Sequence, residues 1–346
     1  MNLIKFQNIF YKEIRDLIEK SRNKVAQSVN AEITMLNWYV GKRIQAKALS
    51  SERAEYGKQT IIFLSRKLTE EYGRGWSTKQ LWHCVHFAEI FPDRKIVSTL
   101  WRQLNWSQIK IIMYLDGSIK RDFYIEMTKL ERWDVRTLQA RVDSMLFERT
   151  AVSKKPDTVI TQDLALLKEE GKLTPDLVFR DPYFLDYLGL SDVYSEKDLE
   201  SAILAELTKF IIELGTDFAF MARQKRITID NEDYYIDLLF YHRRLKCLVA
   251  IDLKLGKFKA AYKGQMELYL RWLEKYEVQE GENQPIGLIL CSGKNQEHIE
   301  LMQLDKSNIK VADYLTKLPD MKLLETKLKQ SIERAKNRLD QVKDTE

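Results

Sequence analysis

Apolar residues recur at helical spacing through the first 150 residues, where almost no strand pattern occurs. The series runs through Ile14, Ile18, Val25, Ile33, Leu36 and Val40. Three later helices are expected to begin at Ser77, Ser107 and Asp134, because each follows a tryptophan and precedes an apolar residue four positions on. Gln80 adds a capping box at the first of them. The pattern predicts an all-helical N-terminal domain, residues 1–150.

The hydrophobic pattern loosens between residues 151 and 175 and then changes its period. The stretch Ser153–Asp157 contains a proline and two lysines, so we expect residues 151–175 to form a linker. An apolar stripe from Leu199 to Leu214 then predicts a helix that ends at Gly215.

Strand patterns follow this helix. Strands are expected at Phe218–Ile229, Tyr234–Tyr241 and Leu245–Leu253, joined by short polar turns that are typical of an antiparallel meander. A helix at Ala260–Tyr276 and an apolar strand at Ile286–Cys291 come next. This order predicts an α/β sandwich, so the fold class of the whole chain is expected to be α+β.

The last segment, residues 321–346, is predicted to be a highly charged helix with an apolar stripe that starts at Met321, Leu324 and Leu328. Such a stripe packs on its own chain by default, or otherwise on a partner or another subunit. The predicted organisation is therefore a helical domain (1–150), a linker (151–175), a second domain (176–320) and a charged terminal helix (321–346).

Composition narrows the class of protein. Of the 346 residues, 45% are hydrophobic and 31% are charged, which is typical of globular chains and unlike disordered or collagen-like ones. No apolar run approaches the ~20 residues of a membrane span, and no signal-peptide core is present near residue 1. We therefore expect a cytoplasmic protein with no membrane partner, whose three scattered cysteines are reduced.

The charge is unevenly distributed. Residues 1–150 hold 26 Lys/Arg and 17 Asp/Glu, a net charge of +9, whereas residues 151–346 hold 30 and 34, a net charge of −4. Short helices with excess positive charge favour a helix-turn-helix or winged-helix-like domain that binds DNA. Arg74 and Lys79 flank a predicted helix N-terminus and are candidate phosphate contacts. A helical protein-interaction domain would account for the same features, so both interpretations stay open.

Charged residues interrupt two apolar strands of the second domain. Asp252 and Lys254 are two residues apart and point to one face of their strand, whereas Leu253 points to the other. Asp237 lies within the neighbouring apolar strand. Two carboxylates brought together repel each other unless a cation lies between them, and such hard ligands suit Mg²⁺ or Mn²⁺ rather than zinc. A surface ion pair between Asp252 and Lys254 is the alternative, but it leaves Asp237 unexplained.

Helices on either side of these strands supply further candidates. Glu200 lies in the centre of the apolar stripe that ends at Leu214, either as a first-turn residue favoured by the helix dipole or as a metal-site group. Gln265 and Tyr269 share one face of the later helix and can hydrogen-bond phosphate or Lys254.

In this order, Asp237, Asp252-Leu253-Lys254 and a helix with Gln265 and Tyr269 resemble the PD-(D/E)XK nuclease superfamily with its Q-x-x-x-Y element. The chain is similar in particular to the YhcG-type nucleases, apart from the tail after about residue 320. The segments that carry this closer resemblance are Asp181–Tyr183, Arg223–Arg226, Tyr235–Leu238, Ile251–Lys254, Ile286–Cys291, Asn37–Gly41 and Tyr72–Gly75. One departure from the superfamily pattern is Ile236, which stands where proline often precedes the first aspartate.

The resemblance implies a restriction-endonuclease-like core, with a central mixed sheet flanked by helices, that hydrolyses phosphodiester bonds of nucleic acid. DNA is favoured over RNA as the expected substrate class. It implies that Asp237, Asp252 and the carbonyl of Leu253 hold Mg²⁺ or Mn²⁺, with Glu200 holding a second metal or an outer-shell water. Lys254 would orient the attacking water or stabilise the developing charge, and Gln265 would fix either of them.

The resemblance also implies nucleic-acid contacts for Arg223, Lys225, Arg226 and Tyr269, although a solvated strand edge is an alternative for the three basic residues. A homodimer is favoured for cutting two strands. The competing functions are a non-catalytic nucleic-acid-binding module and an interaction adaptor.

Overall fold

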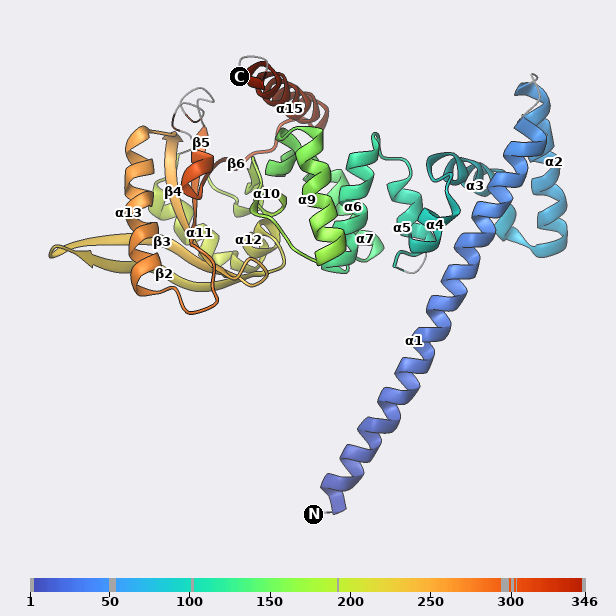
Figure 1. The fold of residues 1–346 in the computed structure, drawn as a ribbon, viewed down its shortest axis with the longest axis horizontal. Helices are drawn as coiled ribbons and strands as arrows, with labels where there is room; N and C mark the ends of the chain where they lie inside the picture. Colours follow the sequence, from blue (N-terminus) through green and yellow to red (C-terminus); the bar gives the residue numbers. More distant parts are fainter. Residues whose placement is uncertain are drawn as a thin grey trace. The chain divides into compact units, whose positions relative to one another are not determined.

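A computed structural model describes residues 3–49, 54–100, 103–191, 193–293, 299, 302 and 304–343. The chain forms two compact units, Met1–Ala140 and Arg141–Glu346. Figure 1 colours the elements along the sequence, from the blue helices of the first unit to the yellow, orange and red strands of the second.

The first unit is helical, as the spacing of its apolar residues predicted. Its elements are α1 (Leu3–Ile44), a π-helical segment (Gln45–Leu49), α2 (Ala54–Tyr72), a 3-10 turn (Arg74–Trp76), α3 (Thr78–Ile90), α4 (Arg94–Leu100), α5 (Trp106–Ile112), α6 (Ser118–Glu131) and α7 (Val135–Asp143). No strand occurs among the described residues of this unit, so the β-wing of a winged helix is absent from them. The helix-turn-helix interpretation stays a prediction.

Two of the three predicted helix starts are confirmed. The side chains of Ser77 and Asp134 each accept a hydrogen bond from the backbone N–H three residues on. The prediction at Ser107 was wrong, because Asn105 caps α5 and forms a full capping box with Gln108. Asn105 lies two residues before Ser107, and its side chain accepts a hydrogen bond from the free N–H of Gln108.

Helices α1 and α3 pack at very close range. A Cβ atom added to Gly41 would lie 1.9 Å from the carbonyl oxygen of Cys84, so only glycine fits at this crossing. Across the same interface, the Gln80 side-chain amide donates to Asn37 at 3.2 Å. Gln80 therefore joins two helices instead of completing the capping box expected at Ser77.

The second unit contains a six-stranded sheet in the order β1-β6-β5-β4-β3-β2. The strands are β1 (Tyr183–Phe184), β2 (Phe218–Ile229), β3 (Glu232–His242), β4 (Cys247–Lys257), β5 (Ile286–Gly293) and β6 (Ile309–Leu315). Strands β2, β3 and β4 form the predicted antiparallel meander, and β5, β6 and β1 add parallel pairs. The mixed sheet is confirmed, although β1 and β6 were not predicted.

Helices cover both faces of this sheet. The helices of this unit are α8 (Leu146–Arg149), α9 (Asp157–Glu170), α10 (Pro175–Val178), α11 (Glu196–Ala205), α12 (Leu207–Leu214), α13 (Ala260–Tyr276) and α15 (Met321–Lys343), with 3-10 turns at Ala151–Lys154, Asp186–Leu188 and Leu304–Ser307. One face packs against α11 and α12 through Leu199 and Phe210, and the other packs against α13 through Met266 and Leu270 (Figure 1). The helix predicted from Leu199 to Leu214 is thus interrupted, because the backbone leaves the helical conformation at Glu206.

The stretch expected to be a linker is structured. Residues 151–175 contain a 3-10 turn and α9, whose Ile160, Leu164 and Leu167 side chains are buried. Pro156, which was interpreted as a break, instead precedes the first helical residue, where its missing N–H costs nothing.

The C-terminal helix packs on its own unit, which was the default expectation. Leu324 and Leu328 of α15 are buried in one cluster with Met145 and Phe184. The side chains of the stripe beyond residue 337 lie outside the described residues.

Glu213 is an acidic residue of α12 with two arginine partners. It is buried and forms ion pairs with Arg149 at 2.5 Å and Arg180 at 3.1 Å. Burial alone would raise the pKa of this carboxyl, but the two arginines outweigh burial and hold the pKa below its usual range. Glu213 is therefore a charged anchor between α12, α8 and the segment before β1.

Candidate active site

The candidate site lies where β3 and β4 separate. The last pair of their ladder joins Leu238 to Ile251, so one further step in the same register brings Asp237 opposite Asp252. Between β2 and β3, Arg223 pairs with Leu238 and Lys225 pairs with Ile236. The unpaired step between these two pairs brings Gln224 opposite Asp237. Three polar side chains therefore follow one another across three apolar strands.

Asp252 is almost fully buried and faces a lysine. Its residue is 2% exposed, and the Nζ atom of Lys254 lies 2.9 Å from its Oδ2 atom. No donor in the described part of the chain meets that oxygen at hydrogen-bond angles. The predicted arrangement is confirmed, since Val249, Ile251 and Leu253 pack in the cluster on the opposite face. A buried carboxylate with an unused lone pair has capacity for a further ligand.

The side chain of Asp237 accepts a hydrogen bond from the β4 backbone at the step where β3 and β4 no longer pair. The N–H of Leu253 donates to its Oδ2 atom at 2.8 Å, and the Gln224 amide donates to its Oδ1 atom at 3.0 Å. The carboxylate is thus fixed between the two separating strands. Its position also holds the backbone of Leu253, whose carbonyl is the third ligand implied by the resemblance.

Glu200 is linked to the aspartates through Gln224. The Gln224 amide donates to Glu200 at 2.7 Å, and Arg223 Nε donates to the other carboxylate oxygen at 2.6 Å. Because α11 begins at Glu196, Glu200 lies beyond the first turn, which removes the first-turn explanation. Gln224 therefore connects Glu200 to the carboxylate of Asp237.

The sequence analysis missed Gln224. Its φ of +46° turns the β2 backbone locally into the left-handed region, which lets Arg223 and Gln224 reach the same carboxylate although strand neighbours normally alternate. A regular strand pattern could not reveal this. The only available signal was an uncharged amide within the Arg223–Arg226 run.

The helix α13 places Gln265 and Tyr269 beside the strands. The Gln265 amide hydrogen-bonds the Tyr269 hydroxyl, which in turn donates to the carbonyl of Tyr235 at 3.0 Å. Tyr269 is 1% exposed, so it does not contact a nucleic-acid backbone at the surface as predicted. It is a support for Gln265 and for the start of β3.

Two other predicted nucleic-acid contacts in the second unit pair with acidic residues outside this group. Lys225 pairs with Glu277 at 2.7 Å, and the exposed Arg226 pairs with Asp233 at 2.8 Å. Of the basic residues predicted in this unit, Arg223 is the one whose described ion pair joins the acidic group. Arg74 and Lys79 are both exposed in the first unit, and their contact with nucleic acid stays a prediction.

Electrostatics disfavour the charged form of both aspartates. Burial raises the pKa of Asp252 to about 7, with a further rise from Asp237 that Lys254 only partly offsets. Burial also raises the pKa of Asp237, and Glu200 adds to the effect. Burial would lower the pKa of Lys254, but the attraction of Asp252 raises it overall, so this lysine stays protonated.

The donor set fits a hard divalent cation. Asp237, Asp252 and the Leu253 carbonyl offer only oxygens, and Mg²⁺ commonly uses one or two protein carboxylates and keeps several waters. Within the described ranges, no three Asp, Glu, His or Cys side chains come together as a metal-binding group. Asp237 and Asp252 are therefore the two side-chain ligands that these strands bring together, and the predicted role of Glu200 at a metal stays a prediction.

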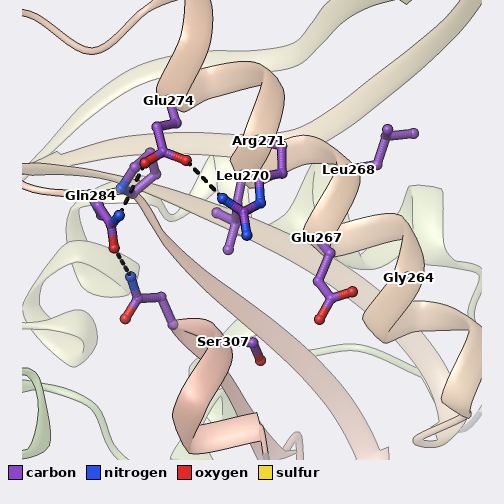
Figure 2. Close-up of a pocket in the computed structure, with 10 residues that line it drawn as sticks. Gly264, Glu267, Leu268, Leu270, Arg271, Glu274, Gln284 and Ser307 are labelled. Carbon is purple, nitrogen blue, oxygen red and sulfur yellow. Dashed lines mark hydrogen bonds and ion pairs between the residues drawn. The ribbon is translucent and has the colours of Figure 1, made fainter.

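A separate pocket of about 480 Å³ lies along another side of α13. Figure 2 shows Arg271 and Glu274 of that helix beside Gln284, with Ser307 below them. None of the candidate catalytic or metal-binding residues lines it. It is not the site of the proposed chemistry.

Comparisons with known proteins agree with the motif order. Residues 176–331 match the YhcG PDDEXK nuclease domain, and residues 13–149 match the DUF1016 N-terminal domain. The first match reaches into α15, beyond the limit at about residue 320 that the sequence suggested. The chain is 33% identical to a protein of Escherichia coli (strain K12) described as "Putative nuclease YhcG", over 92% of this chain and 93% of that protein.

Two solved structures also show local likeness. One is a repair endonuclease from Pyrococcus abyssi (19% identity, TM-score 0.26, 37% of this chain and 50% of that one). The other is EndoMS in apo form (16% identity, TM-score 0.25, 37% of this chain and 48% of that one). The chain thus spans about half the length of either structure. No described helix has the length and apolar character needed to cross a bilayer.

Proposed function

The chain belongs to the YhcG family of nucleases, and we propose that it is a divalent-metal-dependent nuclease that hydrolyses phosphodiester bonds of DNA. The observation that carries the proposal is the pair Asp237 and Asp252, opposed in register where two strands separate, with Lys254 at 2.9 Å from the second carboxylate. Burying two like charges together is costly, and a bound cation would remove that cost.

In the proposed site, the carboxylates of Asp237 and Asp252 and the carbonyl of Leu253 hold Mg²⁺ or Mn²⁺. The bound ion supplies charge neutralisation at the phosphate and lowers the pKa of a water. Asp237 has a second task, because its hydrogen bond from the Leu253 N–H fixes the backbone that carries the third ligand.

Lys254 is the group proposed to act on the reacting phosphate. Its side chain is 12% exposed, and its ammonium lies 5.4 Å from the centre of the Tyr262 ring. Asp252 raises its pKa, so it carries its charge at neutral pH and can stabilise negative charge that develops at phosphorus or orient the attacking water. Gln265, held by Tyr269, is proposed to position that lysine or water.

Glu200 and Gln224 are proposed as positioning residues. Gln224 donates to both Glu200 and Asp237, so it fixes the orientation of one metal-binding carboxylate. Arg223 holds Glu200 in place through an ion pair at 2.6 Å. The first unit, with a net charge of +9 over residues 1–150, is proposed to hold the nucleic acid, and a second copy of the chain is proposed for cutting both strands.

The test is cleavage of a panel of supercoiled plasmid, duplex, single-stranded and branched DNA, and RNA, with Mg²⁺, Mn²⁺ or EDTA. Parent, Asp252→Ala and Lys254→Ala proteins are compared, with Lys209→Ala as a control because that exposed lysine of α12 pairs with Glu206. The proposal expects metal-dependent products from the parent and the control alone. Absence of cleavage of every substrate, with retained binding, would support a non-catalytic nucleic-acid-binding module instead.

A further inference from the structure

An exposed aromatic cluster lies in the first unit, between α3 and the segment after α5. Lys79, His83 and His86 lie on one face of α3, at spacings of four and three residues. Tyr114 contacts both histidines. Its ring stacks on His86 with a centroid separation of 4.6 Å and an interplanar angle of 18°, and its hydroxyl lies 2.7 Å from His83 Nδ1.

The tyrosine is both exposed and held rigidly. Its residue is 53% exposed, which is unusual for an aromatic side chain with two fixed contacts. The His86 Nε2 atom lies 3.0 Å from the carbonyl of Met113, so the stacked histidine is itself fixed to the backbone. A rigid, exposed ring loses little conformational entropy when a flat ligand stacks on it.

The charges around the ring are mainly positive. Burial and the nearby Lys110 and Lys79 lower the pKa of His83, so its neutral imidazole can accept the hydrogen bond from the Tyr114 hydroxyl. Neither lysine forms an ion pair in the part of the chain that the structure describes. One carboxylate, Glu89, lies 3.6 Å from His86, and it is ten residues further along α3 than Lys79.

We propose that Tyr114, with His83, His86, Lys79 and Lys110, binds a single-stranded segment of nucleic acid. An unpaired base stacks on the Tyr114 ring, and the neighbouring phosphates contact the two lysines. Stacking accepts any base, and it requires a base that is not already stacked within a duplex. This inference rests on the proposed function, since it names the form of nucleic acid that the first unit holds.

The test uses the full-length protein in EDTA, which prevents metal-dependent cutting. Binding is measured by fluorescence anisotropy with a fluorescein-labelled 20-nucleotide oligo-dT and with a labelled hairpin duplex. Tyr114→Ala should weaken binding of the single strand about 5- to 100-fold, the range expected for loss of one base–aromatic stack. Binding of the duplex should change less than about twofold by comparison.

Two further variants separate stacking from folding. Tyr114→Phe removes the hydroxyl but keeps the aromatic ring, so it should bind the single strand within about twofold of the parent. Tyr72→Ala removes a tyrosine elsewhere in the unit that is 65% exposed, and it should leave binding unchanged. Lys79→Ala and Lys110→Ala should each reduce the slope of log affinity against log salt by about 0.7.

The proposal is overturned if Tyr114→Ala binds oligo-dT as tightly as the parent, or if it weakens duplex binding to the same extent. It is also overturned if Tyr114→Phe behaves like the alanine variant. These outcomes are independent of catalysis: a protein that cleaves DNA but binds without Tyr114 keeps its nuclease site, and one that binds through Tyr114 but cleaves nothing loses only the nuclease proposal.

Discussion

Replacing Asp252 with asparagine should stabilise the metal-free protein at alkaline pH. Its pKa is raised to about 7 by burial and by Asp237, whereas the unfolded chain has an aspartate pKa of about 3.9. Between these two values the folded state binds more protons than the unfolded state, so the free energy of unfolding falls as pH rises through this window. The free energy of unfolding that is lost by burying the charged Asp252 carboxylate is lost in full above pH 7, and none of it is lost below about pH 4.

The magnitude follows from the size of the shift. About three pKa units correspond to about 4 kcal/mol at pH 8, and coupling to Asp237 makes this an upper value. The attraction of Lys254 is already included, because that lysine is present when Asp252 ionises. An asparagine side chain stays uncharged at every pH and avoids this cost. Asp252→Asn should therefore raise the melting temperature of the second unit by several degrees at pH 8 and by about a third as much at pH 5.

Thermal unfolding in EDTA at pH 5, 6, 7 and 8 is the assay, followed by the same scans with Mg²⁺. The ion should stabilise the parent at pH 8, which is above the raised pKa of Asp252, and leave Asp252→Asn unchanged. Asp233→Asn is the matched control, since hydrogen bonds from Arg226 and Thr228 lower the pKa of Asp233 and the change should not stabilise. Equal melting temperatures of parent and Asp252→Asn at pH 8 would refute the reasoning.

Three further substitutions probe other parts of the structure. Gly41→Ala should destabilise the first unit by about 1–3 kcal/mol in urea unfolding, because the new Cβ would lie 1.9 Å from the Cys84 carbonyl; Gly264→Ala, which meets nothing within 4 Å, should not destabilise. Glu213→Gln should cost about 3–5 kcal/mol, since it leaves two buried arginines without their carboxylate, and retention of the parent's denaturation midpoint would contradict this. Gln224→Leu should weaken Mg²⁺ binding about 10- to 100-fold in calorimetry with little change in melting temperature, and unchanged affinity would exclude a positioning role.

The sequence predicted the parts of the fold that depend on local pattern. The bounds of β2 and α13 agree with the structure, because each has strong periodicity and is limited by turn residues. Strand β6 was missed since Lys310 and Asp313 interrupt its apolar run, and its pairing with β5 is a tertiary feature. The break at Glu206 was missed because both halves of the stripe still face the same core.

The order of the site residues along the chain was predictable from the sequence, but the contacts between their side chains were not. Alternation along β4 correctly set Asp252 and Lys254 on one face, and the hairpin length set Asp237 opposite them. The link from Glu200 through Gln224 depends on a left-handed backbone residue in β2, which no period-two pattern reveals. The burial of Tyr269 likewise depends on how α13 lies on the sheet, so its exposure could not be judged from helical spacing.

The most direct test of the central claim is plasmid cleavage in Mg²⁺ by the parent and by Lys254→Ala. Lys254→Ala leaves both aspartates in place, so it separates loss of catalysis from loss of the metal ligands. The account predicts nicked or linear products from the parent, none in EDTA, and at least a hundredfold slower cleavage by the variant, in the range of about 10²–10³ for loss of one charge-stabilising group. Cleavage by Lys254→Ala at the parent's rate would contradict the account.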